Sequence, residues 1–237
     1  MDKKRMHIII LAIIIGVSCV SLNTNNRVEK IEDTQETTAV PSSGKVVIVD
    51  SGHGGEDGGA VGNNGETEAE INLQIALKLQ KLLEQTGTTV ILTRSDENAI
   101  YDLDAQTLRQ KKISDSKNRV KLANESSADI FVSIHLNKIP EQQYYGWQCF
   151  YKANSDQSKR LAKSIQSNLN DSIQKENNRI AMKISNVYIV KKVEIPISIV
   201  ECGFLSNKQE EQELQTEEYQ ERLAWGVYNG INDYFKK

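Results

Sequence analysis

The chain has 237 residues, which is enough for one large α/β domain or for a domain with a tail. Its hydrophobic content of 38% and charged content of 26% are typical of a soluble globular body. The net charge of −3 argues against nucleic acid as a partner, because nucleic-acid-binding domains carry a basic surface. Three cysteines are too few for a disulfide scaffold, and we interpret Cys149 and Cys202 as two buried thiols rather than a pair.

The N-terminus has the pattern of an export signal. Basic residues at 3–5 precede an apolar run, Ile8–Val20, and this order is typical of a secretory leader or a short membrane anchor. We therefore predict that residues 1–22 are a signal peptide or membrane anchor, and that the protein is exported, either secreted or membrane-anchored. Residues 23–44 are rich in Thr, Glu, Asn and Ser and predict a polar linker, which leaves a single domain over 45–237.

Within this domain, predicted strands alternate with predicted helices. Apolar, β-branched runs predict six strands, at 45–50, 88–93, 128–134, 146–151, 187–190 and 197–200. Apolar residues at helical spacing predict helices at 68–85, towards 119–124, at 155–169, and one or two more over 207–235. This alternation implies an α/β layered domain with a mixed or mostly parallel sheet.

Four polar side chains fall where such a sheet presents its chemistry. His53, His135 and Glu201 each follow a predicted strand, and Glu68 begins the helix fed by the glycine-dense loop 52–59. Two histidines and one carboxylate leave the fourth position of a zinc ion open to water, as in catalytic zinc sites. A further carboxylate, at Glu201, is suited to take a proton from that water. Asp50 is placed to accept a hydrogen bond from a ligand histidine.

Each of these residues also has a structural interpretation. A histidine in a loop is more often a capping or solvent-facing residue, and Glu68 would favour a helix N-terminus without any metal. His135 is equally compatible with a strand-end polar group, and Glu201 with a buried carboxylate paired to an arginine. Residue types and spacing alone leave the metal interpretation and these alternatives about equally balanced.

Several motifs, in order, resemble those of the zinc N-acetylmuramoyl-L-alanine amidases of bacterial cell-wall metabolism. The resemblance covers the whole domain from about Lys45. It lies in Asp50-Ser-Gly-His-Gly-Gly55 with Asp57-Gly-Gly-Ala60, Glu68-Ala-Glu-Ile-Asn-Leu73, Leu92-Thr-Arg94, Arg119-Val-Lys-Leu-Ala-Asn124, Ser133-Ile-His-Leu-Asn137 and Val200-Glu-Cys-Gly-Phe-Leu-Ser-Asn207.

The resemblance implies a twisted six-stranded sheet flanked by helices, of the phosphorylase/hydrolase-like kind. It implies one zinc ion per chain, held by His53, Glu68 and His135, with Glu201 as the catalytic carboxylate. The substrate of the family is the amide that joins N-acetylmuramic acid to the L-alanine of the peptidoglycan stem peptide. The alternatives are a zinc peptidase or amidohydrolase acting on another cell-wall amide, and a peptidoglycan-binding protein without catalysis.

Within the family, a short apolar leader and one bare domain look most like the germination-specific amidases of spore formers, which act in cortex maturation so that muramic-δ-lactam forms. This implies a location between the forespore membranes or in the cortex. Ser51 departs from the usual proline of the family, and the turn before His53 is expected to be looser. We therefore hypothesise that zinc affinity is modest and that an accessory protein recruits the enzyme or completes its zinc site.

Overall fold

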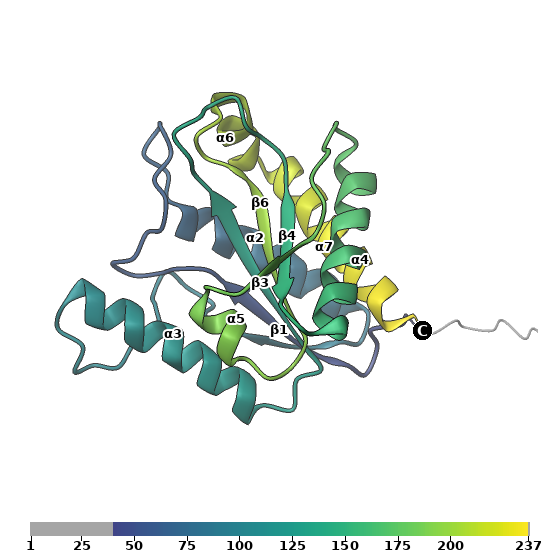
Figure 1. The fold of residues 1–237 in the computed structure, drawn as a ribbon, viewed down its shortest axis with the longest axis horizontal. Helices are drawn as coiled ribbons and strands as arrows, with labels where there is room; N and C mark the ends of the chain where they lie inside the picture. The colour runs from purple at the N-terminus through teal and green to yellow at the C-terminus, as the bar shows by residue number, and fades with distance from the viewer. Residues whose placement is uncertain (1–39, 237) are drawn as a thin grey trace, which may run out of the picture. The chain divides into compact units, whose positions relative to one another are not determined.

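A computed structural model of the chain describes residues 40–236, which form a three-layer α/β/α domain (Figure 1). Its six strands are β1 Val46–Ser51, β2 Thr89–Leu92, β3 Ile130–Asn137, β4 Gln148–Lys152, β5 Met182–Ile184 and β6 Ile197–Phe204. They form one sheet in the order β2-β1-β3-β6-β4-β5. The strands from β2 to β6 in this order are parallel, whereas β4 runs antiparallel to β6 and parallel to β5. The predicted mixed, mostly parallel six-stranded sheet is confirmed.

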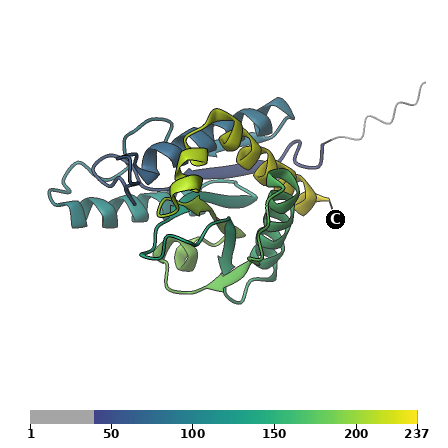
Figure 2. The same cartoon turned by 90° about the horizontal axis from the view of Figure 1, so that it is seen from above.

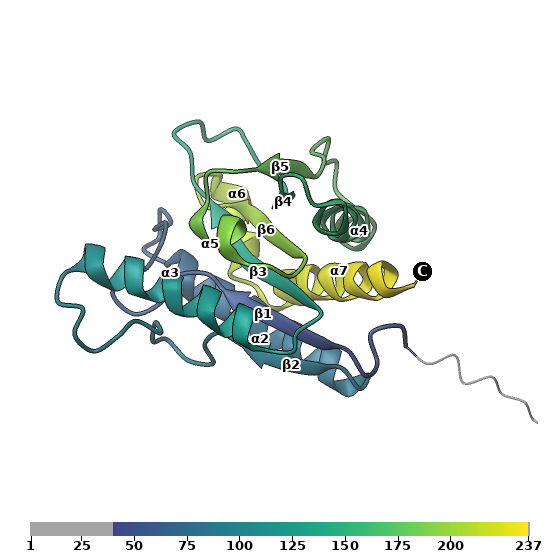
Figure 3. The same cartoon turned by 60° about the horizontal axis from the view of Figure 1, so that its bottom comes forward.

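Helices cover both faces of the sheet. They are α2 Glu68–Gln85, α3 Leu108–Glu125, α4 Asp156–Ile173, α5 Tyr188–Lys192, α6 Lys208–Leu214 and α7 Glu217–Phe235. Apolar side chains of α2, α4 and α7 share one core with one face of the sheet, and those of α3 and α5 share a second core with the other face. Figures 2 and 3 show the sheet between these two layers.

Side chains alternate between the two faces of the central strands, and this alternation determines which of them face the candidate site. On β6, Val200 and Cys202 belong to the core under α4 and α7, while Ile197 and Ile199 belong to the core under α3 and α5. Because successive side chains point to opposite faces, Glu201 lies on the α3 and α5 side. Both Cys149 and Cys202 are buried free thiols, as the sequence analysis predicted.

One predicted strand is wrong. Residues 187–190 are not a strand, because Tyr188–Lys192 forms the short helix α5, and the sixth strand is β5, earlier in the chain. The Val-Tyr-Ile-Val run has strand-like composition, but Val190 is buried on one side of a single turn while Tyr188 is exposed. Two lysines in the last turn favour the helix through its dipole.

The domain begins before the predicted boundary at residue 45. Ser42 is fully buried; its backbone N–H donates to Asn232 Oδ1, and its carbonyl accepts from the Thr88 hydroxyl. The predicted leader and most of the predicted linker lie outside the described residues. Among residues 40–236, no helix combines the length and apolar character needed to cross a bilayer.

Candidate metal centre and active site

Three of the predicted site residues meet at the carboxyl edge of the sheet. The ligand-type atoms of His53, Glu68 and His135 all lie within 4.8 Å of one another. Glu68 Oε1 is 3.3 Å from His53 Nε2 and 3.0 Å from His135 Nδ1. The two imidazole rings meet edge to face, with centroids 5.1 Å apart. Two nitrogens and one carboxylate oxygen that converge in this way make a donor set suited to a divalent metal.

His53 is held in a backbone conformation that side chains rarely adopt. Its φ of 62° lies in the left-handed region, which costs roughly 1–2 kcal/mol for a residue with a Cβ. Arg119 Nη2 donates to the His53 carbonyl at 2.7 Å, and Arg94 Nη2 donates to the Gly52 carbonyl at 3.1 Å. These two buried guanidinium groups therefore fix the turn that presents the histidine.

Two glycines of the loop leave room for two of the predicted ligands, His135 and Glu68. A Cβ on Gly52 would lie 2.3 Å from the His135 ring, so only glycine lets that ring pack against the turn. Gly59 has a φ of 69°, and a Cβ there would lie 2.6 Å from Glu68 Oε2. The glycine-dense loop is thus required by the close approach of the His135 and Glu68 side chains as well as by its turns.

Glu68 is the first residue of α2, where the helix dipole favours a carboxylate. Thr67 caps this helix in a reciprocal capping box with Glu70, which fixes where the helix begins. Glu68 Oε2 accepts from the Ala60 N–H at 2.9 Å, and Oε1 accepts from the Leu136 N–H at 3.1 Å. Burial disfavours the charged form, but the hydrogen bonds to the two histidines outweigh it and hold the pKa of Glu68 well below its usual value.

Asp57 is the carboxylate that orients His53, one of the predicted ligands. His53 Nδ1 is 2.9 Å from Asp57 Oδ2, which directs Nε2 towards Glu68. Asp57 Oδ1 is 2.9 Å from Lys112 Nζ. Burial lowers the pKa of His53, but the hydrogen bonds to Asp57 and Glu68 outweigh it and raise that pKa to about 9. This role was not predicted from the sequence, although Asp57 belongs to the first motif and follows His53 by four residues.

Asp50 does not take the role that the sequence predicted. It is fully buried, and its hydrogen bonds come from Arg119 Nη1, at 2.5 Å, and from the Ser133 hydroxyl. Side chains alternate between the faces of a strand, and Asp50 points towards α3, which carries Arg119. His53 lies beyond the turn that follows β1, so Asp50 does not reach it. Asp50 therefore anchors the arginine that holds the His53 carbonyl.

Glu201 lies beside the histidine pair and is chemically unlike Glu68. It is the register partner of His135 across β3 and β6. Its Oε2 is buried and has no hydrogen-bond partner among residues 40–236. Burial raises the pKa of Glu201 above its usual value. It lines a cavity of about 300 Å³ together with His135 and residues of α5, including Tyr188.

Fold and site together define an α/β enzyme with a candidate metal centre at the carboxyl ends of its strands. The model of the N-acetylmuramoyl-L-alanine amidase family matches residues 47–233, and the chain belongs to this family of peptidoglycan hydrolases. The germination-specific N-acetylmuramoyl-L-alanine amidase of Bacillus subtilis is 36% identical over 86% of this chain and 85% of its own length.

Solved structures agree in fold. The CwlD amidase from Clostridioides difficile, in complex with the GerS lipoprotein, matches with a TM-score of 0.78 and 44% identity, over 80% of this chain and 98% of that one. The catalytic domain of the amidase CwlV from Bacillus (Paenibacillus) polymyxa var. colistinus matches with a TM-score of 0.69 and 32% identity, over 80% of this chain and 97% of that one.

Proposed function

We propose that this chain uses one zinc ion, held by His53, Glu68 and His135, to hydrolyse the amide between N-acetylmuramic acid and L-alanine in peptidoglycan. The observation that carries the proposal is the convergence of three donor atoms next to a carboxylate, Glu201, whose Oε2 is unpartnered. Such a donor set leaves a coordination position for water, whose pKa zinc lowers to about 7, and zinc also polarises a carbonyl.

The residues of the chain supply the remaining steps. Glu201 accepts the proton of the attacking water at Oε2 and donates it to the leaving nitrogen of L-alanine, the role of a general base and then a general acid. Glu68 and the histidines hold their positions through the capped helix and the Asp57 hydrogen bond. The cavity beside Glu201 admits the substrate from the α5 side.

We further infer a role in spore cortex maturation, in an extracytoplasmic location reached through the N-terminal segment. The similarity to an amidase named as germination-specific supports this role. The similar CwlD amidase was solved with a lipoprotein, which supports an accessory partner for this chain as well. We expect that partner to recruit the enzyme or to complete its zinc site.

Product analysis tests the activity. The zinc-loaded full chain is incubated with purified peptidoglycan, and released peptides are sequenced from their amino ends. Free L-alanine amino termini support the amidase, whereas shortened stems with an intact lactyl amide would favour a peptidase. Glu201→Gln is expected to lower the rate by roughly 10²–10⁴-fold while zinc stays bound.

Zinc content tests the ligand set separately. Elemental mass spectrometry is expected to find about one zinc per parent chain and per Glu201→Gln chain, and little in His135→Ala. Equal zinc in the parent and in His135→Ala would contradict the ligand assignment. If both hold little zinc, adding the membrane fraction from sporulating cells distinguishes a missing partner from a wrong site.

A further inference from the structure

Arg179 presents a fixed positive charge near Glu201. Its guanidinium carbon lies 4.6 Å from the centre of the Phe204 ring and 5.9 Å from that of Tyr144. Its Nε donates to the Tyr145 carbonyl at 3.1 Å, and Nη1 donates to Gln148 Oε1 at 3.3 Å. Two aromatic rings and two acceptors therefore fix a side chain that is otherwise long and flexible.

This arginine differs from the two that support the metal centre. Arg119 is paired with the carboxylates of Asp50 and Asp115, and Arg94 donates to four backbone carbonyls. Among residues 40–236, no carboxylate lies within ion-pair distance of Arg179, and no acceptor receives a hydrogen bond from its Nη2. It is only partly exposed, so its charge is incompletely balanced by solvent.

The position of Arg179 relative to the chemistry follows from strand register. Gln148, which accepts from Arg179, is the direct partner of Glu201 across β4 and β6. Side chains of directly paired residues lie on the same face of a sheet, about 5 Å apart. The guanidinium therefore lies on the order of 10 Å from the Glu201 carboxylate, which an extended peptide spans in about three residues.

We propose that Arg179 binds a carboxylate of the stem peptide, beyond the L-alanine whose nitrogen leaves. In the proposed reaction Glu201 delivers a proton to that nitrogen, so the released peptide starts beside Glu201, and a peptide that extends over Gln148 reaches Arg179. A planar guanidinium with its Nη2 donors directed to no protein acceptor matches the paired oxygens of a carboxylate. The inference rests on the proposed amidase function, and Arg179 would set a preference for acidic stems.

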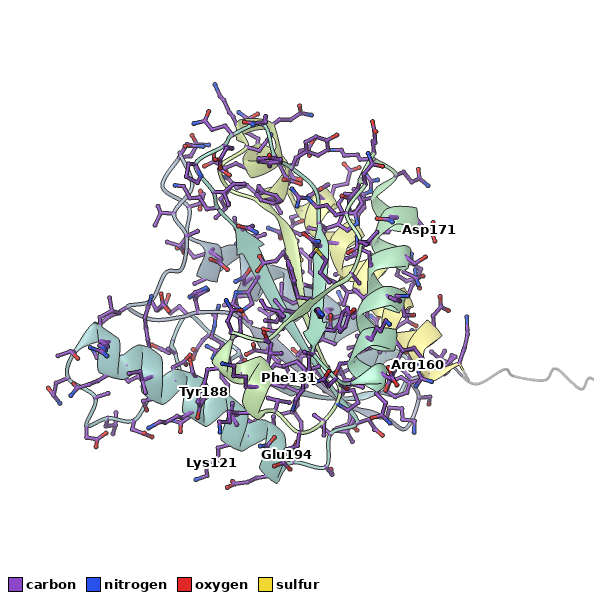
Figure 4. The ribbon with its side chains drawn as sticks, in the orientation of Figure 1. Lys121, Phe131, Arg160, Asp171, Tyr188 and Glu194 are labelled. Atoms are coloured by element: carbon purple, nitrogen blue, oxygen red, sulfur yellow. The ribbon has the colours of Figure 1, made fainter. Side chains whose placement is uncertain are left out.

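The test compares two muropeptide substrates that differ in one group. In the first, the residue after L-alanine is a glutamate with a free α-carboxylate; in the second, that carboxylate is an amide. Steady-state kinetics are measured on the zinc-loaded full chain and on Arg179→Ala, Arg179→Lys and Arg160→Ala. Arg160 is the matched control, because it also stacks on an aromatic ring, Tyr234, but lies near the start of α4 (Figure 4).

Arg179→Ala is expected to lower kcat/KM for the free-carboxylate substrate by roughly 10- to 100-fold, mainly through KM, and to leave the amidated substrate unchanged. Arg179→Lys is expected to retain part of the kcat/KM that Arg179→Ala loses, because lysine keeps the positive charge but lacks the two parallel N–H donors of the guanidinium. Arg160→Ala changes neither substrate. An equal loss on both substrates would mean that Arg179 only supports the loop, and would overturn the proposal, as would no loss at all.

A binding measurement separates this proposal from the proposed function. The two peptides that begin with L-alanine, with the free and the amidated carboxylate, are titrated into the full chain by calorimetry. Tighter binding of the free carboxylate that disappears in Arg179→Ala supports the anchor even if the parent releases no peptide. Equal affinity for both peptides overturns the proposal that Arg179 binds the carboxylate, even if the parent is an active amidase.

Discussion

The two walls of the site balance their charges differently. On the wall of the predicted ligands, the carboxylates of Asp50, Asp57 and Glu68 all have protein partners. On the wall formed by β6 and β4, Glu201 has an unpartnered oxygen and Arg179 has no carboxylate partner among residues 40–236. Satisfied groups hold a geometry, whereas unsatisfied ones await water or substrate. The charged groups of the first wall therefore hold its geometry, whereas those of the second remain open to water and substrate.

Among the residues around the predicted ligands, we expect the replacement of Arg119 to have the largest effect on stability. We expect Arg119→Met to lower the free energy of unfolding by about 3–5 kcal/mol, because it leaves the buried Asp50 carboxylate without its cation. Urea denaturation of the zinc-free protein measures this. Arg109→Met, an exposed change on the same helix, is the control and is expected to change little.

A double variant distinguishes lost charge pairing from lost volume. Adding Asp50→Asn to Arg119→Met removes the buried charge and should recover part of the stability. If the double variant is no more stable than the single one, the Asp50–Arg119 pair does not account for the rigidity of this wall.

The convergence of His53, His135 and Glu201 was predictable from the sequence because all three follow strand ends. His53, His135 and Glu201 each follow an apolar run, and the carboxyl ends of parallel strands meet at one edge. Which carboxylate forms a hydrogen bond with His53 was not predictable in the same way. Whether Asp50 or Asp57 contacts His53 depends on a left-handed turn that no spacing rule specifies.

The second wall was less predictable still. Glu201 came from a strand end, but Arg179 lies in an irregular stretch whose contacts come from residues more than 20 positions away in sequence. Helix α5 was mistaken for a strand because four apolar residues specify burial without specifying the period. Long-range contacts, rather than local pattern, determine this side of the site.

Glu210 on α6 makes the stability of the β4 and β6 side of the site depend on pH. Its carboxylate accepts from the N–H groups of Gly146 and Phe204, yet burial outweighs these hydrogen bonds and raises its pKa to about 7. A carboxyl whose pKa is raised by folding stabilises the protein below its unfolded pKa, and this stability is lost as pH rises through the folded pKa.

We therefore expect the free energy of unfolding of the parent, relative to that of Glu210→Gln, to fall by up to about 3 kcal/mol from pH 4 to pH 8. Denaturant unfolding at several pH values measures the difference. Glu221→Gln, an exposed change on α7, is the control for net charge. Parallel pH profiles for the parent and Glu210→Gln would show that this buried carboxyl carries no such linkage.

The smallest expected effect concerns Asp57, and it tests whether the ligand wall is rigid at the metal itself. Asp57→Asn keeps the shape but weakens the acceptor of the His53 Nδ1 proton, so we expect zinc affinity to fall by roughly 10–100-fold. Competition with a chromophoric chelator measures the affinity. Glu56→Gln is the matched control, because Glu56 pairs with Lys111 rather than with a ligand histidine. Equal affinities for Asp57→Asn and the parent would mean that the backbone turn held by Arg119 and Arg94 orients His53 without help from a carboxylate.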